Sequence, residues 1–299
     1  MLPHAEHLPL NQALSGNAQE PNYVEEAENS TGVRNMTTEI SQHELIPVVI
    51  LCGGMGIRMG DERPKMLVEV GGRPILWHVM KIYAAQGFIH FILALGYRGD
   101  MIKRYFLDYG PLNHDFTLTL GAAPTIEYHD PHPEGGWRIT FADTGLHTQT
   151  GARIRKVARY IESDTFFATY GDGVADIDLH ALLAFHHRMG RVATLTGVRS
   201  FSRFGVLRTD GKGLVVGFEE KPLVDALING GFFVFEREVL NYLGDSDDVV
   251  LEREPLQRLA AEGQLAIYEH HGFWRAMDTF KDAQEMNVIW RESAPWKMW

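Results

Sequence analysis

The segment that decides the fold is "IPVVILCGGMGIRMGDERPK", residues 46–65. It starts as an unbroken apolar run and continues into a stretch that holds four glycines, two arginines and one lysine. Such a run is typical of a strand that is buried on both faces, as in a parallel sheet. The glycine-rich stretch would then lie beyond the carboxyl end of the strand, where open α/β sheets bind their ligands.

This stretch has the composition of a phosphate-binding loop. Glycines let backbone N–H groups converge on an anion, and Arg58 and Lys65 add charged donors for phosphate oxygens. Two better-known phosphate loops do not match. The P-loop string is absent, and the dinucleotide fingerprint needs a small residue where Met59 stands. The sequence therefore predicts a phosphate loop of another kind.

The chain beyond Lys65 alternates between strand and helix patterns. A second apolar run, "FIHFILALG" at residues 88–96, predicts another buried strand. Between the two runs, Ile75, Val79 and Ile82 recur at helical spacing, which completes a βαβ unit. Similar alternation continues to about residue 190. We therefore predict an α/β fold with a doubly wound, mostly parallel sheet of the Rossmann-like type.

After Arg191 the predicted strands follow one another closely. They are "RVATLTGVRS", "FGVLRTD", "LVVGFEEKP" and "INGGFFVFE". Strands joined by short connections pair in antiparallel fashion. The pattern predicts antiparallel additions to the sheet, which would make it mixed and form a substrate-facing region.

The start of the chain lacks such a pattern. Residues 1–44 are rich in Asn, Glu, Ser and Pro without a sustained apolar period, so we expect a disordered N-terminal extension. Met36 is an alternative start of translation. The organised domain is then residues 45–299.

Composition excludes several classes of protein. The 299 residues carry a formal net charge of -11, which argues against a general affinity for nucleic acid or for an anionic membrane. The single cysteine, Cys52, excludes an internal disulfide. No apolar run is long enough to span a bilayer and the N-terminus does not resemble a signal peptide, so we expect a cytoplasmic protein.

Several motifs, in one order, carry a resemblance to a known family. They are "GGMGIRMGDERPKMLVEVGGRPILWHVM", "DTGLHTQTGARIRKVARYI", "YGDGVADIDL", "RFGVL", "FEEKP", "INGGFFVF", "LEREPLQRLAAEGQLAIYEHHGFWRAMDT" and "APWK". The chain resembles the sugar-1-phosphate nucleotidylyltransferases, and within them the cytidylyltransferases that act on glucose 1-phosphate. The resemblance implies the nucleotide-diphospho-sugar transferase type of sheet.

The resemblance also implies a reaction. An oxygen of a sugar 1-phosphate attacks the α-phosphorus of CTP, and pyrophosphate leaves, so the enzyme must position phosphate groups and neutralise their charge. Mg²⁺ would be the cofactor, because it prefers carboxylate and phosphate oxygens. By the resemblance, Asp172 and Asp278 are its ligands, and Arg58, Lys65 and Asp172 are the catalytic residues.

The family motifs assign two substrate subsites. Residues 45–190 would bind the nucleotide, and residues 191–299 the sugar phosphate. The nucleotide-binding residues implied are Gly53, Gly54, Gly56, Arg58, Lys65, Gly151 and Arg153, of which Arg153 would contact the pyrimidine. The sugar-phosphate residues implied are Tyr170, Glu220, Lys221 and Asn229. Relatives commonly assemble, which implies a homo-oligomer.

Two alternatives stay open. Ile57 stands where the family has Thr, and Ala152 where it has Gly, so UTP or dTTP could replace CTP. Another sugar 1-phosphate is a further alternative within the same reaction class. A metal-dependent glycosyltransferase is the other alternative, because Asp176 to Asp178 match an Asp-x-Asp string. Asp178, however, directly precedes a predicted helix and is well placed to be its N-cap.

Overall fold

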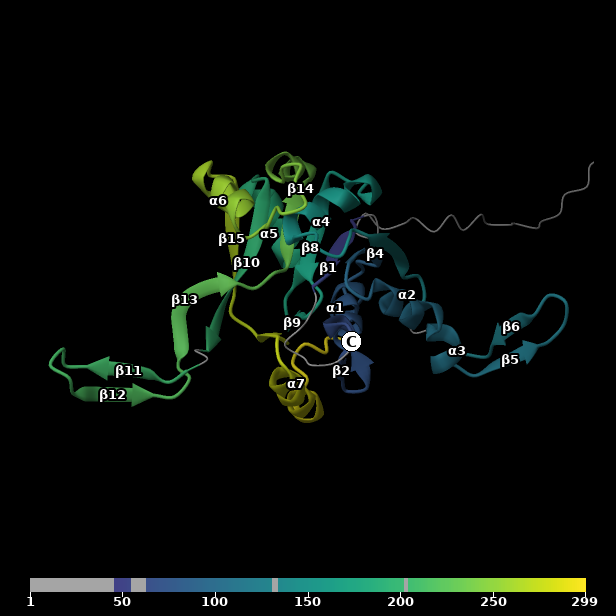
Figure 1. Ribbon diagram of the computed structural model, residues 1–299, viewed down its shortest axis with the longest axis horizontal. Helices are drawn as coiled ribbons and strands as arrows, with labels where there is room; N and C mark the ends of the chain where they lie inside the picture. Colours follow the sequence, from purple (N-terminus) through teal and green to yellow (C-terminus); the bar gives the residue numbers. More distant parts are fainter. Residues whose placement is uncertain (1–45, 55–62, 131–133, 202–203) are drawn as a thin grey trace, which may run out of the picture. The chain divides into compact units, whose positions relative to one another are not determined.

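The computed structural model describes residues 46–54, 63–130, 134–201 and 204–299 (Figure 1). These residues belong to one compact unit, Ile40–Trp299. The predictions for residues 1–44, and those for Gly56 and Arg58, lie outside the described residues.

The first apolar run forms an interior strand of an eight-stranded sheet. All five residues of β1 (Val48–Cys52) are buried, as expected for a strand covered on both faces. It pairs in parallel with β4 (His90–Leu95) and β8 (Thr165–Tyr170), and β7 (Arg138–Asp143) extends the parallel part beyond β4. The predicted parallel βαβ arrangement is therefore confirmed.

Four strands after Arg191 complete this same sheet, but the predicted strands "FGVLRTD" and "LVVGFEEKP" do not join it, because they pair only with each other as a separate hairpin. The sheet order is β13-β10-β14-β8-β1-β4-β7, and β15 pairs with β10. These later strands are β10 (Ala193–Phe201), β13 (Leu223–Asn229), β14 (Phe233–Glu236) and β15 (Leu265–His270). The pairings β8–β14, β14–β10 and β10–β13 are antiparallel, whereas β10–β15 is parallel. The sheet is mixed, as predicted.

One predicted strand proved to be two. The segment "INGGFFVFE" contains the end of β13 and all of β14, separated by residues 230–232. Gly231 and Phe232 have φ angles of +75° and +45°, a left-handed backbone that ends a strand. Strands β13 and β14 run in the same direction, each antiparallel to β10, so these residues form an irregular step between two successive strands.

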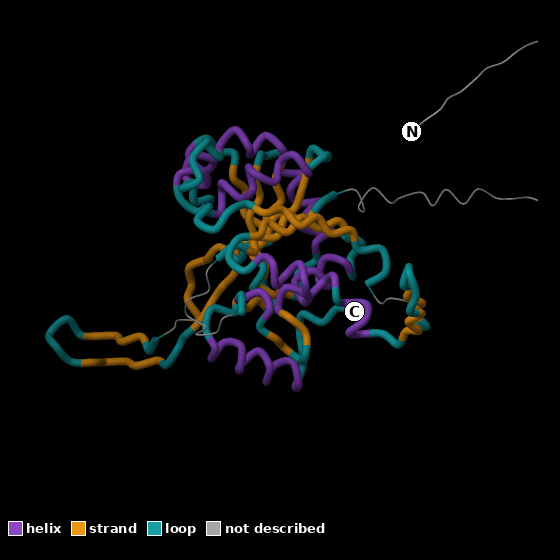
Figure 2. Tube along the Cα trace, turned by 45° about the vertical axis from the view of Figure 1, so that its right-hand side comes forward, coloured by secondary structure: helices purple, strands orange, loops and turns teal. Residues whose placement is uncertain are grey.

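Helices cover both faces of the sheet (Figure 2). Apolar side chains of α1, α5 and α7 belong to one core, and those of α4 and α6 to the other. The helices are α1 (Ile75–Ala84), α2 (Gly99–Leu107), α3 (Tyr109–Asn113), α4 (Thr150–Val157), α5 (Leu179–Met189), α6 (Glu254–Ala261) and α7 (Phe280–Glu292). The 3₁₀ helices are η3 (Lys65–Leu67), η4 (Ala158–Tyr160) and η5 (Arg237–Tyr242). No helix among the described residues is long and apolar enough to span a bilayer.

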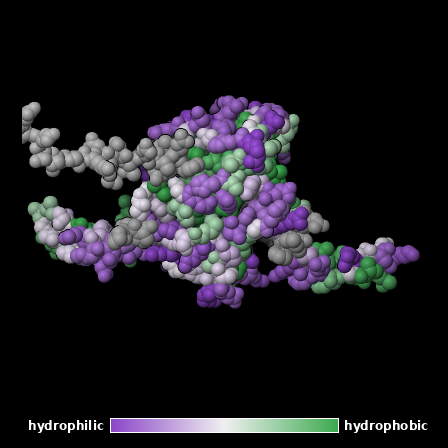
Figure 3. Space-filling view, turned by 180° about the vertical axis from the view of Figure 1, so that it is seen from behind, coloured by the Kyte–Doolittle hydropathy of each residue, from purple (hydrophilic) through white to green (hydrophobic). Residues whose placement is uncertain are grey.

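Four short strand pairs complete the fold. They are β2 (Glu69–Val70) with β3 (Arg73–Pro74), β5 (Phe116–Thr119) with β6 (Thr125–Tyr128), β9 (Gly173–Ala175) with β16 (Trp274–Ala276), and β11 (Val206–Thr209) with β12 (Val215–Glu219). The β5–β6 and β11–β12 hairpins extend away from the large sheet (Figure 1). Apolar side chains such as Leu118, Leu207 and Phe218 are exposed on them, and the hydropathy surface shows apolar atoms on both (Figure 3).

Candidate active site

Lys65, Asp172 and Asp278 form a cluster just beyond the carboxyl ends of β1 and β8. The Lys65 Nζ atom lies 2.6 Å from Asp172 Oδ2 and 2.8 Å from Asp278 Oδ1. The side chain of Lys65 is 12% exposed and that of Asp172 18% exposed, so both are largely removed from water. The structure thus brings together three residues that the sequence motifs had singled out separately.

A short strand pair places the two aspartates side by side. Asp172 follows β8, and Asp278 follows β16. Strands β9 and β16 pair in antiparallel register, and the Met277 N–H donates to the Asp172 carbonyl at 3.0 Å. Two segments about a hundred residues apart in the chain therefore end at one point.

The main chain at Asp278 is held by the first turn of α7. Thr279 and Asp282 form a reciprocal capping box there. Asp282 Oδ2 also accepts a hydrogen bond from the Asp278 N–H at 3.0 Å. On the other side, Met66 and Leu67 are buried next to Lys65 and anchor η3. The cluster is consequently built on fixed backbone.

Burial and charge set the protonation of this cluster. Burial raises the pKa of Asp172, and the neighbouring Asp278 carboxylate raises it further, while Lys65 acts against both. Burial lowers the pKa of Lys65, but the two carboxylates outweigh burial and leave the pKa above its usual value. Lys65 is therefore a cation at neutral pH and compensates the negative charge of the aspartates.

The pair of aspartates fits a hard divalent cation that is completed by substrate. Carboxylate oxygens of both residues lie within 2.8 Å of one nitrogen atom, so they converge on a common point. No group of three or more His, Cys, Asp or Glu residues among the described residues could hold a metal by itself. Mg²⁺ commonly uses one or two carboxylates together with phosphate oxygens and water, and this donor set suits it.

Arg153 lies inward, against the ends of the central strands. Its guanidinium donates to the carbonyls of Leu95 and Gly53, at 2.9 and 3.1 Å, and to Thr144 Oγ1. A Cβ atom at Gly53 would lie 1.9 Å from Arg153 Cζ, so this packing requires glycine there. Arg153 therefore joins the carboxyl end of β4 to Gly53, which directly follows β1.

The other predicted nucleotide-binding glycines differ in their surroundings. Gly54 is exposed, and a Cβ atom there would meet nothing within 4 Å, so its backbone is accessible. Gly151 is buried, and its N–H already donates to the Val249 carbonyl at 3.0 Å. The backbone of Gly54 is thus accessible to a ligand, whereas the amide of Gly151 has a partner within the chain.

Two of the predicted sugar-site residues share a hydrogen-bond chain. Asn229 Nδ2 donates to the Tyr170 hydroxyl oxygen at 3.0 Å, and that hydroxyl donates to Glu252 Oε1. Thr150 Oγ1 donates to Glu252 Oε2 at 2.7 Å. Sequence reasoning missed Glu252 and Thr150, although both stand inside quoted motifs.

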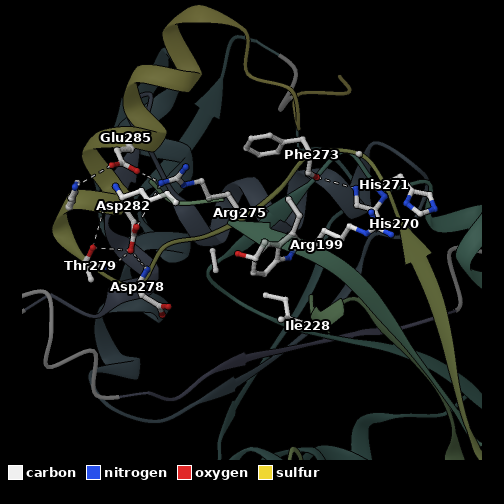
Figure 4. A pocket seen from close by; sticks show the side chains of 16 residues that line it. Arg199, Ile228, His270, His271, Phe273, Arg275, Asp278, Thr279, Asp282 and Glu285 are labelled. Carbon is white, nitrogen blue, oxygen red and sulfur yellow. Dashed lines mark hydrogen bonds and ion pairs between the residues drawn. The ribbon is translucent and has the colours of Figure 1, made fainter. Parts of the chain in front are cut away.

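Lys221 lines a cavity of about 970 Å³. Asp278 lines the same cavity (Figure 4). Arg199, His271 and Arg275 add basic side chains to its wall, and Asp282 and Glu285 add acidic ones. Lys221 is exposed and has a φ angle of +48°, which is uncommon for a residue with a side chain. Glu220 is exposed beside it and is absent from the cavity wall.

The Asp-x-Asp string has structural partners in this fold. Asp178 Oδ1 accepts a hydrogen bond from the Ala181 N–H at 2.8 Å, which confirms that Asp178 is the N-cap of α5. Asp176 Oδ1 lies 3.0 Å from His270 Nε2.

A Rossmann-like mixed sheet with two glycines, a lysine and two aspartates beyond its carboxyl edge defines an enzyme class that handles phosphate groups. The chain belongs to the nucleotidyl transferase family, whose sequence model matches residues 47–287. Membership confirms the resemblance drawn from the motifs.

Individual relatives agree with this assignment. The glucose-1-phosphate cytidylyltransferase of Salmonella typhimurium is 44% identical over 257 residues, which cover 84% of this chain and 98% of the relative. The mannose-1-phosphate guanylyltransferase of Mycobacterium tuberculosis is 32% identical over 248 residues, covering 79% of this chain and 62% of that protein. The crystal structure of HddC from Yersinia pseudotuberculosis has a TM-score of 0.60 at 21% identity, covering 81% of this chain and 98% of that one, and shares the fold.

Proposed function

We propose that this enzyme transfers a cytidylyl group from CTP to α-D-glucose 1-phosphate, giving CDP-glucose and pyrophosphate. A phosphate oxygen of the sugar 1-phosphate forms a bond to the α-phosphorus, and the bond from that phosphorus to the β-phosphate bridging oxygen breaks. The observation that carries the proposal is Lys65 between Asp172 and Asp278, at the edge of a nucleotidyl transferase sheet.

The residues of the chain divide the work between binding and charge. Lys65, together with Arg58, would bind the triphosphate and stabilise the charge that develops on the phosphate oxygens. Asp172 and Asp278 would hold Mg²⁺, which supplies further neutralisation of those oxygens when it is bound. Lys221 would bind the sugar phosphate, because it lies in the cavity that also contains Asp278.

We choose CTP as the nucleotide because of the sequence identity to a cytidylyltransferase and because of the residues in the proposed nucleotide subsite. Identity is 44% to a cytidylyltransferase and 32% to a guanylyltransferase, over similar lengths. Gly53, Gly54, Gly56, Gly151 and Arg153 would form the nucleotide subsite, with Arg153 at its base. UTP and dTTP remain the alternatives within the same reaction, because they share the pyrimidine O2 acceptor with CTP. A glycosyltransferase is disfavoured by family membership and by the capping role of Asp178.

The sugar subsite would combine Lys221 with Tyr170, Asn229 and Glu220. The hydrogen bond between Asn229 and Tyr170 supports placing these two together. Glu220 is the member with the least support, because it lies outside the cavity wall. Its carboxylate would have to approach the sugar when substrate binds.

We further propose that the enzyme acts as a homo-oligomer in the cytoplasm, where nucleoside triphosphates are available. Exposed apolar side chains on the β5–β6 and β11–β12 hairpins support self-association, since isolated two-stranded hairpins are marginally stable in water. Light scattering after size-exclusion chromatography gives the mass directly. A monomeric mass at micromolar concentration would contradict the proposed homo-oligomer.

The experiment that tests the reaction is a substrate matrix. CTP, UTP, dTTP, ATP and GTP are each combined with several sugar 1-phosphates, and pyrophosphate release is measured. We expect the highest kcat/KM for CTP with glucose 1-phosphate. A preference for UTP or dTTP would contradict the cytidylyl assignment and leave the reaction class standing. Absence of pyrophosphate release with every pair would contradict the class.

A further inference from the structure

Glu252 accepts two hydrogen bonds that connect different parts of the site. Its Oε1 atom accepts from the Tyr170 hydroxyl, which stands at the end of β8, two residues before Asp172. Its Oε2 atom accepts from Thr150, the first residue of α4, the helix that also carries Arg153. Neither the family motifs nor the proposed mechanism gives Glu252 a role.

Main-chain donors fix the direction of each hydrogen bond in the series Asn229–Tyr170–Glu252. The Gly231 N–H donates to Asn229 Oδ1 at 3.0 Å, so the other amide atom of Asn229 is the NH₂ group. That group can only donate, and it donates to the Tyr170 oxygen. The single proton of the tyrosine must therefore go to Glu252.

The same logic holds on the other side of Glu252. The Leu251 N–H donates to Thr150 Oγ1 at 2.9 Å. The threonine proton is then free to go to Glu252 Oε2, where the structure places it at 2.7 Å. Glu252 must accept on both oxygens, and an ionised carboxylate is the side chain that does so.

We propose that Glu252 is a positioning residue for the sugar subsite. This inference rests on the proposed function. By accepting the tyrosine proton, Glu252 keeps the Tyr170 oxygen as an acceptor for Asn229. The second N–H of the Asn229 amide makes no hydrogen bond to any of the described residues, so it is available to a hydroxyl oxygen of the sugar. Glu252 thus keeps Asn229 in a fixed orientation as a hydrogen-bond donor. Through its hydrogen bond from Thr150, Glu252 also connects Asn229 and Tyr170 to the start of α4.

Glu252→Gln is a sharp test, because it keeps the size of the side chain and changes only its hydrogen-bonding pattern. A glutamine offers one accepting oxygen, so its NH₂ group must face either Tyr170 or Thr150 and displace a proton that has no other acceptor. Glu254→Gln is the matched control. Glu254 is exposed in the first turn of α6, two residues away, and takes no part in the chain of hydrogen bonds.

We expect Glu252→Gln to raise the KM for glucose 1-phosphate about tenfold, the effect of one lost hydrogen bond to a charged group, and to change the KM for CTP much less. Glu254→Gln should match wild type in both constants. Tyr170→Phe should likewise raise the KM for glucose 1-phosphate more than the KM for CTP. In the double variant, the KM for glucose 1-phosphate should not exceed that of the more affected single variant, because both changes break the same hydrogen-bond chain. Equal effects on the two KM values, or additive effects in the double variant, would overturn the proposal.

A second readout does not depend on turnover. The side-chain amide signals of Asn229, assigned by their loss in Asn229→Asp, should shift in both Glu252→Gln and Tyr170→Phe and stay in place in Glu254→Gln. Unchanged signals in the first two variants would overturn the positioning role. If wild type released no pyrophosphate from CTP and glucose 1-phosphate, the proposed function would fail, and these amide signals would still decide the role of Glu252. If Glu252→Gln did not fold, Tyr170→Phe carries both readouts.

Discussion

The ammonium group of Lys65 lies 2.6 Å from Asp172 Oδ2, in a pair that is largely buried. A buried ion pair of this kind is costly to break, because removal of one partner leaves the other charge without compensation. Asp278, 2.8 Å from the same nitrogen, is the third member of the cluster. Changes to these residues should therefore affect chemistry and local charge together.

The first prediction concerns the proposed metal-binding carboxylates. Asp172→Asn removes one negative charge and one oxygen donor, so we expect kcat to fall by about 100-fold or more. The circular dichroism spectrum should stay native, because Asn has nearly the same volume. EDTA should abolish pyrophosphate release from wild type, and added Mg²⁺ should restore it. Full activity in EDTA would contradict a role for the two aspartates in metal binding.

The second prediction concerns Lys221 in the cavity wall. Lys221→Ala removes a cation that we assign to the sugar phosphate, so the KM for glucose 1-phosphate should rise about tenfold or more while the KM for CTP changes little. Lys212→Ala, in the turn between β11 and β12, is a control on the same part of the chain. Steady-state kinetics with each substrate varied in turn measure both constants. An equal rise in both for Lys221→Ala would indicate a structural role.

The third prediction compares Arg153 with Arg155, the other arginine of α4. Arg153→Lys cannot reach the Leu95 and Gly53 carbonyls at once, and it leaves acceptors unpaired in a buried place. We expect the free energy of unfolding to fall by about 1–3 kcal/mol and the KM for CTP to rise. Arg155 is also on α4 and lies near Asp245 and Asp247. Arg155→Lys should change neither the free energy of unfolding nor the KM for CTP by much.

Arg153→Lys also tests nucleotide choice. If Arg153 contacts the pyrimidine, the preference for CTP over ATP and GTP should narrow in the variant. A variant that loses stability but keeps the wild-type ratio of kcat/KM values would show that Arg153 serves only to join the strand ends.

The fourth prediction concerns stability below neutral pH. His78 is fully buried: its Nε2–H donates to the Val70 carbonyl, and its Nδ1 accepts from Trp296 Nε1. Burial lowers the pKa of His78 to about 4. The unfolded chain, with a histidine pKa of about 6.5, binds this proton first, so stability should fall as the pH drops from about 6.5 to 4.

The expected loss from this one residue is about 3 kcal/mol across that range. His78→Gln keeps a donor and an acceptor but does not titrate, so its urea-unfolding free energy should depend less on pH. Part of the dependence should remain, since burial also lowers the pKa values of His90 and His186. His147→Gln, at an exposed site, should match wild type. Equal slopes for His78→Gln and wild type would refute the role of His78.

The fifth prediction concerns the N-terminal segment. A chain that begins at Met36 should keep the Tm and the kcat/KM of the full chain, because residues 1–35 have no apolar pattern with which to dock. Differential scanning calorimetry and the pyrophosphate assay measure these quantities. A clear drop in Tm would show that the segment packs against the enzyme.

The sequence alone determined the main features of the sheet and the identity of the charged cluster. The apolar run of β1 predicted a strand that is buried on both faces, and alternation with helices predicted parallel neighbours. Asp178 was correctly expected as a helix cap. Lys65, Asp172 and Asp278 could be named because each stands in a local motif that resembles those of the nucleotidylyltransferases. These features depend on residues close together in the chain, where periodicity and backbone preferences act directly.

Only the tertiary structure decided how distant segments meet. Glu252 contacts Tyr170 across 82 residues, and no local pattern distinguishes this glutamate from Glu254. The inward direction of Arg153, on α4, likewise depends on Gly53, which directly follows β1, and on Leu95, the last residue of β4. Such contacts follow from the order and register of the strands, which the summed burial of the whole sheet selects. Local sequence encodes which residues are buried, whereas the packed fold determines which of them touch.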